Sequence, residues 1–428
     1  MLLDENPRRA VINISKPIIL ATFVESIYSI VDTIWVSKLG TLALSAIGAS
    51  FPLLILLYAI SWGLGIGVSS AISRRIGAKR EEEIKEVIGT SVVLGLLFSI
   101  LLFIVSLFLS DIYSLMGIYG EVKKLSISYI APILKFSIIF IFFDIVLGIL
   151  RGMGESKKVM KVSVIGSFLN IILDPIFIYT LNLGIAGAAY ATLISLIIGA
   201  LSVKSSVKLH LRFNFKIAKD LLRVSLPTTF IDLSTAVIFF FLTSLVSKVS
   251  GNYGLAIYTA SLRVTDLGFI PIIGLASGAT SVIGAYYGAK DIKRLKEAYF
   301  FSIKLGLAME ALIVVLLIIL SPYLALLFTF ENSNIYKDLV FYIKIASLYL
   351  LFMPPFFIST SLYQGIGEGE KAFFLSLLRN FLRVIFPYLL AINLFFIFIG
   401  LILGELVSSL ISFILSLLAL KFIEKRVL

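Results

Sequence analysis

The sequence contains no cysteine, and its single histidine, His210, lies in a basic stretch near the middle of the chain. The absence of cysteine excludes disulfide bonds and thiolate metal sites, and one histidine cannot supply a site built from several imidazole ligands. Charged residues are also scarce, at 14% of the 428 residues, whereas hydrophobic residues make up 59%. Together with a mean hydropathy of +1.06, this composition is typical of a protein embedded in a lipid bilayer.

No motif indicates an enzyme or an ATP-driven pump. The segment GIGEGEK at residues 365–371 resembles a phosphate-binding loop only superficially, because it lacks the required spacing and a preceding strand. The net charge of +12 does not require nucleic acid as a partner, since basic loops are expected of any multi-pass membrane protein. The N-terminus lacks a small-residue cleavage site, so we expect insertion through the internal helices. Any uphill transport must then draw on an ion gradient, which is worth about 2.3 kcal/mol per charge per 100 mV.

Twelve apolar segments are long enough to cross about 30 Å of hydrocarbon at 1.5 Å per residue. They form two groups of six, separated by the basic segment 204–223. The pattern predicts an all-α membrane protein with an N-terminal six-helix lobe over residues 1–203, a linker over 204–223 and a C-terminal six-helix lobe over 224–428. The expected spans lie near residues 11–37, 46–73, 84–109, 125–150, 159–180, 184–203, 222–248, 256–286, 297–328, 338–364, 372–391 and 394–420.

The distribution of positive charge predicts the orientation of these spans. The two termini and alternate loops hold about 26 of the 37 Lys and Arg residues, whereas the opposite loops hold about five. The positive-inside rule therefore places both termini and the linker in the cytoplasm. For a multi-pass protein of this kind we expect residence in the plasma membrane.

The two halves of the chain are related by an internal repeat of about 211 residues. GLGIGVSSAISRRIGAK at residues 63–79 aligns with GLASGATSVIGAYYGAK at 274–290, and RGMGESKK at 151–158 aligns with QGIGEGEK at 364–371. Because each copy contains six spans, the halves share one orientation and are related by an axis along the membrane normal. This arrangement suits a transporter with alternating access.

The stretch SFLNIILDPIFIY, residues 167–179, places unusual residues inside an apolar span. Asn170 and Asp174 stand four residues apart on one helical face, so an amide and a carboxylate oxygen could converge on one cation. Pro175 removes a backbone donor and predicts a bend beside the carboxylate. A carboxylate at mid-bilayer depth costs about 2.5 to 3.5 kcal/mol to insert, so it needs a partner, a wet cavity or a function. Interhelical hydrogen bonding beside a structural kink is the alternative interpretation.

The second half does not repeat this acidic chemistry. In the register of the repeat, leucine, arginine and proline occupy the positions that correspond to Asp32, Asn170 and Asp174. Helix packing would be needed equally in both halves, whereas a coupling site need exist only once. The asymmetry therefore favours a functional role for these residues.

Three features together resemble the multidrug and toxic compound extrusion (MATE) family of the prokaryotic type. They are the segment SIVDTIWVSKLGTLALSAIGASFP at residues 29–52, the motif RGMGESKK, and the repeat itself. The resemblance covers essentially the whole chain. It implies a fold of two six-helix bundles arranged in a V, and it implies export of organic cations and other drugs in exchange for Na⁺ or H⁺.

The resemblance also implies which residues bind the coupling ion. In prokaryotic members the first bundle carries the cation site, and the matching positions here are Asp32, Asn170, Asp174 and Thr192. These side chains supply hard oxygen ligands, which suit Na⁺. Clustered carboxylates repel one another, so a proton could take the place of sodium. No cofactor beyond this coupling ion is expected.

Four further residues are expected near this site. Tyr129 and Asp144 look like its neighbours, and Glu25 lies two helical turns before Asp32 on one face. We expect these three residues to serve the proton path or to attract substrate, although Glu25 could equally be a solvated acid. Asp144 replaces the family's more usual asparagine and Glu25 a neutral polar residue, so this lobe is more acidic than most. Pro175 is the expected hinge.

The acids of the second half are expected to be structural. Asp232, Asp266, Glu310 and Glu405 stand among arginines and lysines of neighbouring spans, and internal pairing is the simpler account. Asp232 and Glu405 remain candidates for a substrate or proton role, because acids within the membrane are functional by default.

The sequence favours a secondary-active multidrug exporter that works as a monomer on small cationic or amphipathic molecules in the bilayer. The alternative is a lipid or lipid-linked oligosaccharide flippase, which would use a basic cavity for pyrophosphate instead of an acidic one. A passive channel fits poorly with a twofold repeat and midplane carboxylates, and an enzyme embedded in the membrane fits less well still.

Overall fold

The computed structural model describes residues 6–206, 212–329 and 334–427, and within these ranges the chain is helical and contains no strand. His210 and part of the predicted linker lie outside the described residues. The first half comprises α1 (Pro7–Ser37), α2 (Thr41–Gly77), α3 (Glu81–Leu107), α4 (Leu109–Leu115), α5 (Gly120–Lys135), α6 (Ser137–Gly152), α7 (Ser156–Pro175), the π-helix η1 (Ile176–Thr180) and α8 (Ile185–Leu201). The second half comprises α9 (Phe215–Gly288), α10 (Ile292–Ala325), α11 (Asn334–Ser347), the 3₁₀-helix η2 (Leu348–Phe352), α12 (Met353–Gly365), α13 (Gly369–Leu389) and α14 (Leu394–Val427).

These helices account for the twelve predicted spans. Among the described residues, nine helices are long and apolar enough to cross a membrane, and the bent pair α5 and α6 supplies a tenth span. The 74-residue α9 contains two spans, because the backbone leaves the helical conformation at Gly251, whose φ is 61°. The 17-residue apolar helix α8 supplies the remaining span. The predicted spans near 222–248 and 256–286 therefore meet at a break inside one long helix.

Two spans that the sequence predicts as single helices are interrupted. The span near 125–150 bends by 51° between α5 and α6, and Pro132 lies four residues before the break at Phe136. Proline crowds the turn that precedes it, at residues 128–131, whereas this bend lies in the turn that follows Pro132. The span near 338–364 tightens into η2 directly before α12, whose first two residues are Met353 and Pro354.

The chain separates into two compact units of interacting helices. We call Leu20–Phe230 the N-terminal unit, and Met1–Ile19 together with Ile231–Leu428 the C-terminal unit. The start of α9 thus packs within the N-terminal unit, and the start of α1 packs within the C-terminal unit.

The repeated glycines explain these helix contacts. In the N-terminal unit, a Cβ atom on Gly67 of α2 would collide with Ser225 of α9. In the C-terminal unit, a Cβ atom on Gly278 of α9 would collide with Ser15 of α1. Because only glycine lets helices approach this closely, the repeat preserves one close helix contact in each unit.

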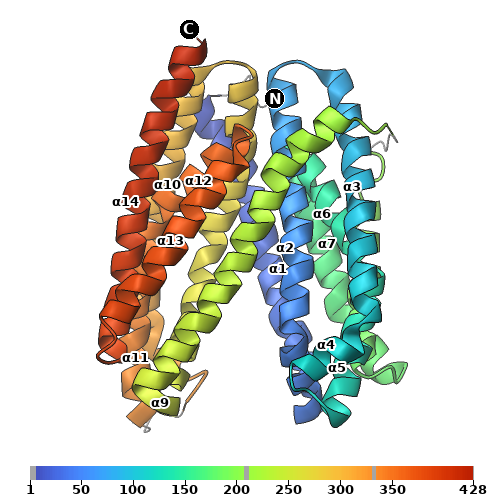
Figure 1. Ribbon diagram of the computed structural model, residues 1–428, viewed down its shortest axis with the longest axis vertical. Helices are drawn as coiled ribbons and strands as arrows, with labels where there is room; N and C mark the ends of the chain where they lie inside the picture. Colours follow the sequence, from blue (N-terminus) through green and yellow to red (C-terminus); the bar gives the residue numbers. More distant parts are fainter. Residues whose placement is uncertain (1–5, 207–211, 330–333, 428) are drawn as a thin grey trace. The chain divides into compact units, whose positions relative to one another are not determined.

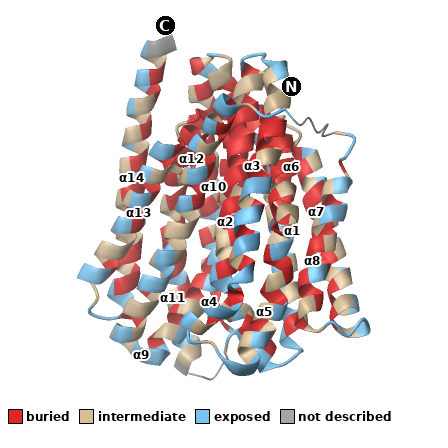
Figure 2. Cartoon of the chain, turned by 45° about the vertical axis from the view of Figure 1, so that its right-hand side comes forward, coloured by how far each residue is buried: buried red, intermediate tan, exposed pale blue. Residues whose placement is uncertain are grey.

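Within the N-terminal unit, α2 is the central helix and contacts α3, α5 and α6 (Figure 1). Its second half is almost continuously buried, whereas α7 and α8 carry exposed residues on their outer faces (Figure 2). Exposed side chains on α8 are apolar, including Ile197 and Leu201 at 40% and 56% exposure. Apolar outer faces of this kind are expected where a helix contacts lipid.

Candidate functional site

The polar residues of α7 and α8 form one hydrogen-bonded group inside the N-terminal unit. The Asn170 side-chain amide donates to Asp174 Oδ1 at 3.3 Å and to Thr192 Oγ1 at 3.1 Å. The Thr192 hydroxyl in turn donates to the carbonyl of Ala188 at 3.0 Å. Asn170 and Asp174 are buried, at 2% and 0% exposure. The spacing of four residues therefore places both side chains on one inward face, as the sequence predicts.

Small residues bring α7 and α8 together at this point. A Cβ atom on Gly199 of α8 would lie 3.4 Å from the Cα atom of Gly166 on α7 and 3.1 Å from the carbonyl oxygen of Val162. Glycines at a helix contact allow the two backbones to approach closely. This close approach carries Thr192 to within hydrogen-bonding distance of Asn170.

Pro175 ends α7 and is followed directly by the π-helix η1. Because proline has no amide hydrogen, the carbonyl of Ile171 cannot receive the usual helical hydrogen bond from position 175. The next turn is wide, and the amide of Leu181 donates to the carbonyl of Ile176 at 2.9 Å. Wide turns of this type are frequent at functional sites. The predicted disturbance beside Asp174 is thus a change of helix type within a continuing span.

Asp32 reaches the group from α1. The carboxyl groups of Asp32 and Asp174 lie close enough to interact with each other. About one turn after Asp174 and one turn after Asp32, the Tyr179 hydroxyl donates a hydrogen bond to the carbonyl of Trp35 at 2.6 Å, which connects η1 to α1. This contact accounts for how two helices far apart in sequence bring their carboxyl groups together.

Three oxygens of this group have no hydrogen-bond partner among the described residues. They are Asp32 Oδ1, Asn170 Oδ1 and Asp174 Oδ2, and all three atoms are buried. Buried polar oxygens are normally satisfied, so the arrangement is suited to a cation or a proton that is shared with water. The described residues contain no cluster of three or more His, Asp or Glu side chains that could hold a metal ion. A cation here would therefore need the amide and hydroxyl oxygens as well as the two carboxylates.

A second group surrounds Arg151 near the end of α6. Arg151 is only 2% exposed, and its guanidinium lies 4.6 Å from the ring centre of Trp62. Asp144 and Glu25 lie close enough for their charges to act on it. The structure thus places these two predicted acids around a cation, whereas Tyr129 is buried close to Asp32.

Arg151 is not among the site residues that the sequence predicts. One signal was available, because position 151 aligns with a glutamine at 364 in the repeat, so its charge is not shared between the halves. The same test of unshared charge had singled out Asp32 and Asp174.

The acids of the C-terminal unit behave differently from one another. Glu405 is fully buried and accepts hydrogen bonds from Arg379 at 2.6 to 3.0 Å, and its Oε1 lies 3.0 Å from Arg383 Nε. Pairing is therefore confirmed for Glu405. The prediction of pairing is wrong for Glu310, because this side chain is 0% exposed and neither of its carboxyl oxygens has a hydrogen-bond partner among the described residues.

Comparison with known proteins identifies the family. The family model described as MatE matches residues 17–176 and 227–389, one segment in each half of the repeat. The chain is 25% identical over 432 residues to the multidrug export protein MepA of Staphylococcus aureus (strain MSSA476), covering 98% of this chain and 94% of that protein. It is 28% identical over 344 residues to the probable multidrug resistance protein YoeA of Bacillus subtilis (strain 168), covering 75% and 73% of the two chains.

The fold also matches solved structures closely. One is an outward-facing conformation of a multidrug resistance MATE family transporter of the MOP superfamily, with a TM-score of 0.95, 36% sequence identity, and coverage of 99% of this chain and 98% of that chain. The predicted fold class and the prediction that the chain is not an enzyme are confirmed. Because the family model matches both halves of the repeat and the helices superpose along their whole length, the chain belongs to the MATE family of membrane transporters.

Proposed function

We propose that this chain exports small organic cations and amphipathic drugs in exchange for Na⁺ or H⁺ at a site formed by Asp32, Asn170, Asp174 and Thr192. The names of the relatives MepA and YoeA, which describe multidrug export and resistance, support the exporter part of this proposal. The site in the N-terminal unit supports the ion-coupling part.

The observation that carries the proposal is the set of three buried, unpartnered oxygens on Asp32, Asn170 and Asp174. Two facing carboxylates in a site of low polarity repel each other strongly when both are charged. A sodium ion relieves this repulsion by coordination, and a proton relieves it by forming a shared hydrogen bond. The two ions therefore compete for the same oxygens.

Aromatic rings near these acids support the choice of an organic cation as substrate. Tyr28, Tyr58 and Tyr129 lie close enough to Asp32 to experience its charge, and the Tyr58 ring lies 6.0 Å from that of Phe140. Ring faces attract organic cations, and a neighbouring carboxylate adds to that attraction. Glu25 and Asp144 contribute further negative charge to the same unit, partly offset by Arg151.

Exchange follows from competition for negative charge. A cationic drug is held best while the carboxylates are ionised and empty. Binding of Na⁺ or H⁺ neutralises them and weakens drug binding, and by linkage a bound drug weakens ion binding to the same extent. Pro175 and the π-helix after it provide the place where α7 and η1 can change curvature when the charge changes.

The topology completes the proposal. Both termini lie in the cytoplasm of a cell whose plasma membrane holds the protein, so export moves drug away from the side that carries the basic loops. Each chain contains both halves of the repeat, and a single copy is the transporting unit.

The test is transport by the purified protein in liposomes. Vesicles loaded with ethidium are given an inward or outward gradient of Na⁺ or of H⁺, and dye fluorescence is followed. We expect movement of dye against its own gradient when either ion flows in the opposite direction. Movement of fluorescent phospholipid between leaflets, without gradient-driven dye transport, would instead identify a flippase.

A further inference from the structure

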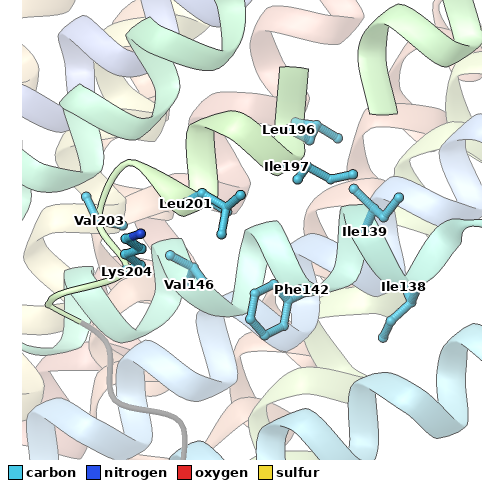
Figure 3. Close-up of a pocket in the computed structure, with 10 residues that line it drawn as sticks. Ile138, Ile139, Phe142, Val146, Leu196, Ile197, Leu201, Val203 and Lys204 are labelled. Atoms are coloured by element: carbon cyan, nitrogen blue, oxygen red, sulfur yellow. The ribbon is translucent and has the colours of Figure 1, made fainter. Parts of the chain in front are cut away.

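A groove of about 470 Å³ runs between α6 and α8 on the surface of the N-terminal unit (Figure 3). Its lining residues are apolar except for Lys204. A volume of this size lies within the range of sites that enclose drug-sized molecules. It is separate from the ion site, because none of the proposed ion ligands lines it.

The helical repeat explains the apolar walls. On α6, Ile139, Phe142 and Val146 recur every three or four residues and form one wall, while Leu196 and Ala200 lie one turn apart on α8 and form part of the other. Phe143 points away from the groove toward α7 and α8, where it lies 3.3 Å from a Cβ atom built on Gly199. The contacts that assemble the ion site therefore leave the neighbouring faces of α6 and α8 open.

The groove is nearly as long as one leaflet of a bilayer is thick. Ile138 and Val146 line its two ends on α6, and eight residues of helix correspond to a rise of about 12 Å. Half of a hydrocarbon core is about 15 Å thick. Water is absent at this depth, so an apolar groove that opens to lipid is occupied by acyl chains.

Lys204 gives the groove a charged end. It lies in the turn that follows α8, is exposed, and stands beside Val146 at the end opposite Ile138 (Figure 3). No carboxylate within residues 6–206, 212–329 and 334–427 forms an ion pair with it. An ammonium group at the end of an acyl-chain groove matches a lipid phosphate in position and in charge.

The C-terminal unit contains a groove that serves as a natural comparison. This groove, of about 480 Å³, is lined by residues of α9, α12, α13 and α14 and also contains one lysine, Lys371. The Lys371 ammonium group already forms an ion pair with Glu368 at 2.6 Å. Its charge is compensated, so this groove lacks the feature that selects an anionic headgroup.

We propose that the groove between α6 and α8 binds one anionic glycerophospholipid, with an acyl chain along Ile139, Phe142 and Leu196 and the phosphate on Lys204. Under the predicted topology the lipid belongs to the cytoplasmic leaflet, where anionic lipids are the ones that basic residues attract. The lipid packs against α8, the helix that carries Thr192, and so stabilises the position of that helix against α7.

The experiment measures lipid retention by native mass spectrometry of the whole chain, delipidated in detergent and titrated with phosphatidylglycerol or phosphatidylcholine of identical acyl chains. We expect phosphatidylglycerol to bind about fivefold more tightly, the contribution of one lysine to the binding of an anionic lipid. Lys204→Gln removes this preference, whereas Lys371→Gln, the matched change in the compensated groove, leaves it intact.

A second variant tests the groove itself. Ala200→Trp fills it and removes the retained lipid of either headgroup, and Leu97→Trp, at a position of α3 that is 58% exposed, serves as control. An unchanged headgroup preference in Lys204→Gln would overturn the proposal. Competition by inorganic phosphate at equal concentration, or displacement of the lipid by tetraphenylphosphonium, would also overturn it, because the site would then belong to a free anion or to the drug.

Discussion

Replacement of Asp174 by asparagine changes the charge of the proposed ion site but not its shape. Asp174 is fully buried, accepts one hydrogen bond from Asn170 and faces the carboxyl group of Asp32. Asparagine has nearly the same volume and keeps an oxygen for Asn170, so packing is preserved. The substitution removes one negative charge from a pair that repels in the absence of a coupling ion.

The size of the effect follows from Coulomb's law. Two unit charges about 4 Å apart at an effective dielectric constant of about 20 interact by roughly 4 kcal/mol. Loss of one carboxylate thus weakens the attraction for Na⁺ by about that amount, which corresponds to roughly a thousandfold loss of affinity. The same estimate predicts that the ion-free protein is stabilised or unchanged, since the repulsion from Asp32 disappears.

Thermal unfolding in detergent tests both consequences. The parent should gain stability on addition of Na⁺ or on acidification, by about 2.7 kcal/mol at an ion concentration one hundred times Kd. Asp174→Asn should show no ion-dependent gain, and its unfolding temperature without ion should equal or exceed that of the parent. Asp266→Asn, an acidic-to-amide change in the C-terminal unit, is the control and should keep the gain. An ion-dependent gain in Asp174→Asn equal to that of the parent would refute the assignment of the site.

Three further predictions concern the proposed hinge, the buried acids of the C-terminal unit and the predicted topology. Pro175→Ala should bind ethidium but export it poorly, and its affinity for ethidium should depend less on Na⁺ and pH than that of the parent. If the affinity depended on Na⁺ and pH as in the parent and efflux were intact, the role of the proline would be only structural. Glu405→Gln should destabilise the protein by about 3 to 5 kcal/mol in thermal unfolding, because it leaves the buried Arg379 uncompensated. Glu310→Gln should not destabilise the protein, since no partner is lost. Equal effects of the two substitutions would contradict this assignment of the pairing. Ser205→Cys, in the cysteine-free background, should resist an impermeant thiol reagent added to intact cells, and labelling from outside would reverse the topology.

The sequence predicts the spans and the inward face of α7 because both depend on local periodicity. Hydropathy sets the length of each span, and the spacing of Asn170 and Asp174 places both on one side of a helix. Pro175 likewise predicts a disturbance from its chemistry alone, although not that the next turn would be a π-helix. The bend between α5 and α6 was missed, since the hydropathy of that span continues unbroken through Pro132.

The remaining features depend on how helices rotate and approach one another. Family resemblance, and not spacing, implied that Asp32 approaches Asp174 and that Thr192 approaches Asn170. These approaches require the close glycine contact between α7 and α8 and the contact of η1 with α1. The sequence does not show that Glu405 is paired and Glu310 is not, because both acids stand among basic residues. Which acid meets an arginine is decided by the rotation of its helix about its own axis, and hydropathy does not determine that rotation in a helix buried on several sides.

The central claim is that drug and coupling ion compete for the carboxylates of the N-terminal unit. The most direct measurement is the release of bound ion when drug is added to the purified transporter, followed with ²²Na⁺ at neutral pH and with a pH-sensitive dye in sodium-free solution. Addition of tetraphenylphosphonium should release Na⁺ or H⁺ from the parent and none from a variant that carries both Asp32→Asn and Asp174→Asn. Drug binding to the parent without ion release, or equal release from the double variant, would contradict the account.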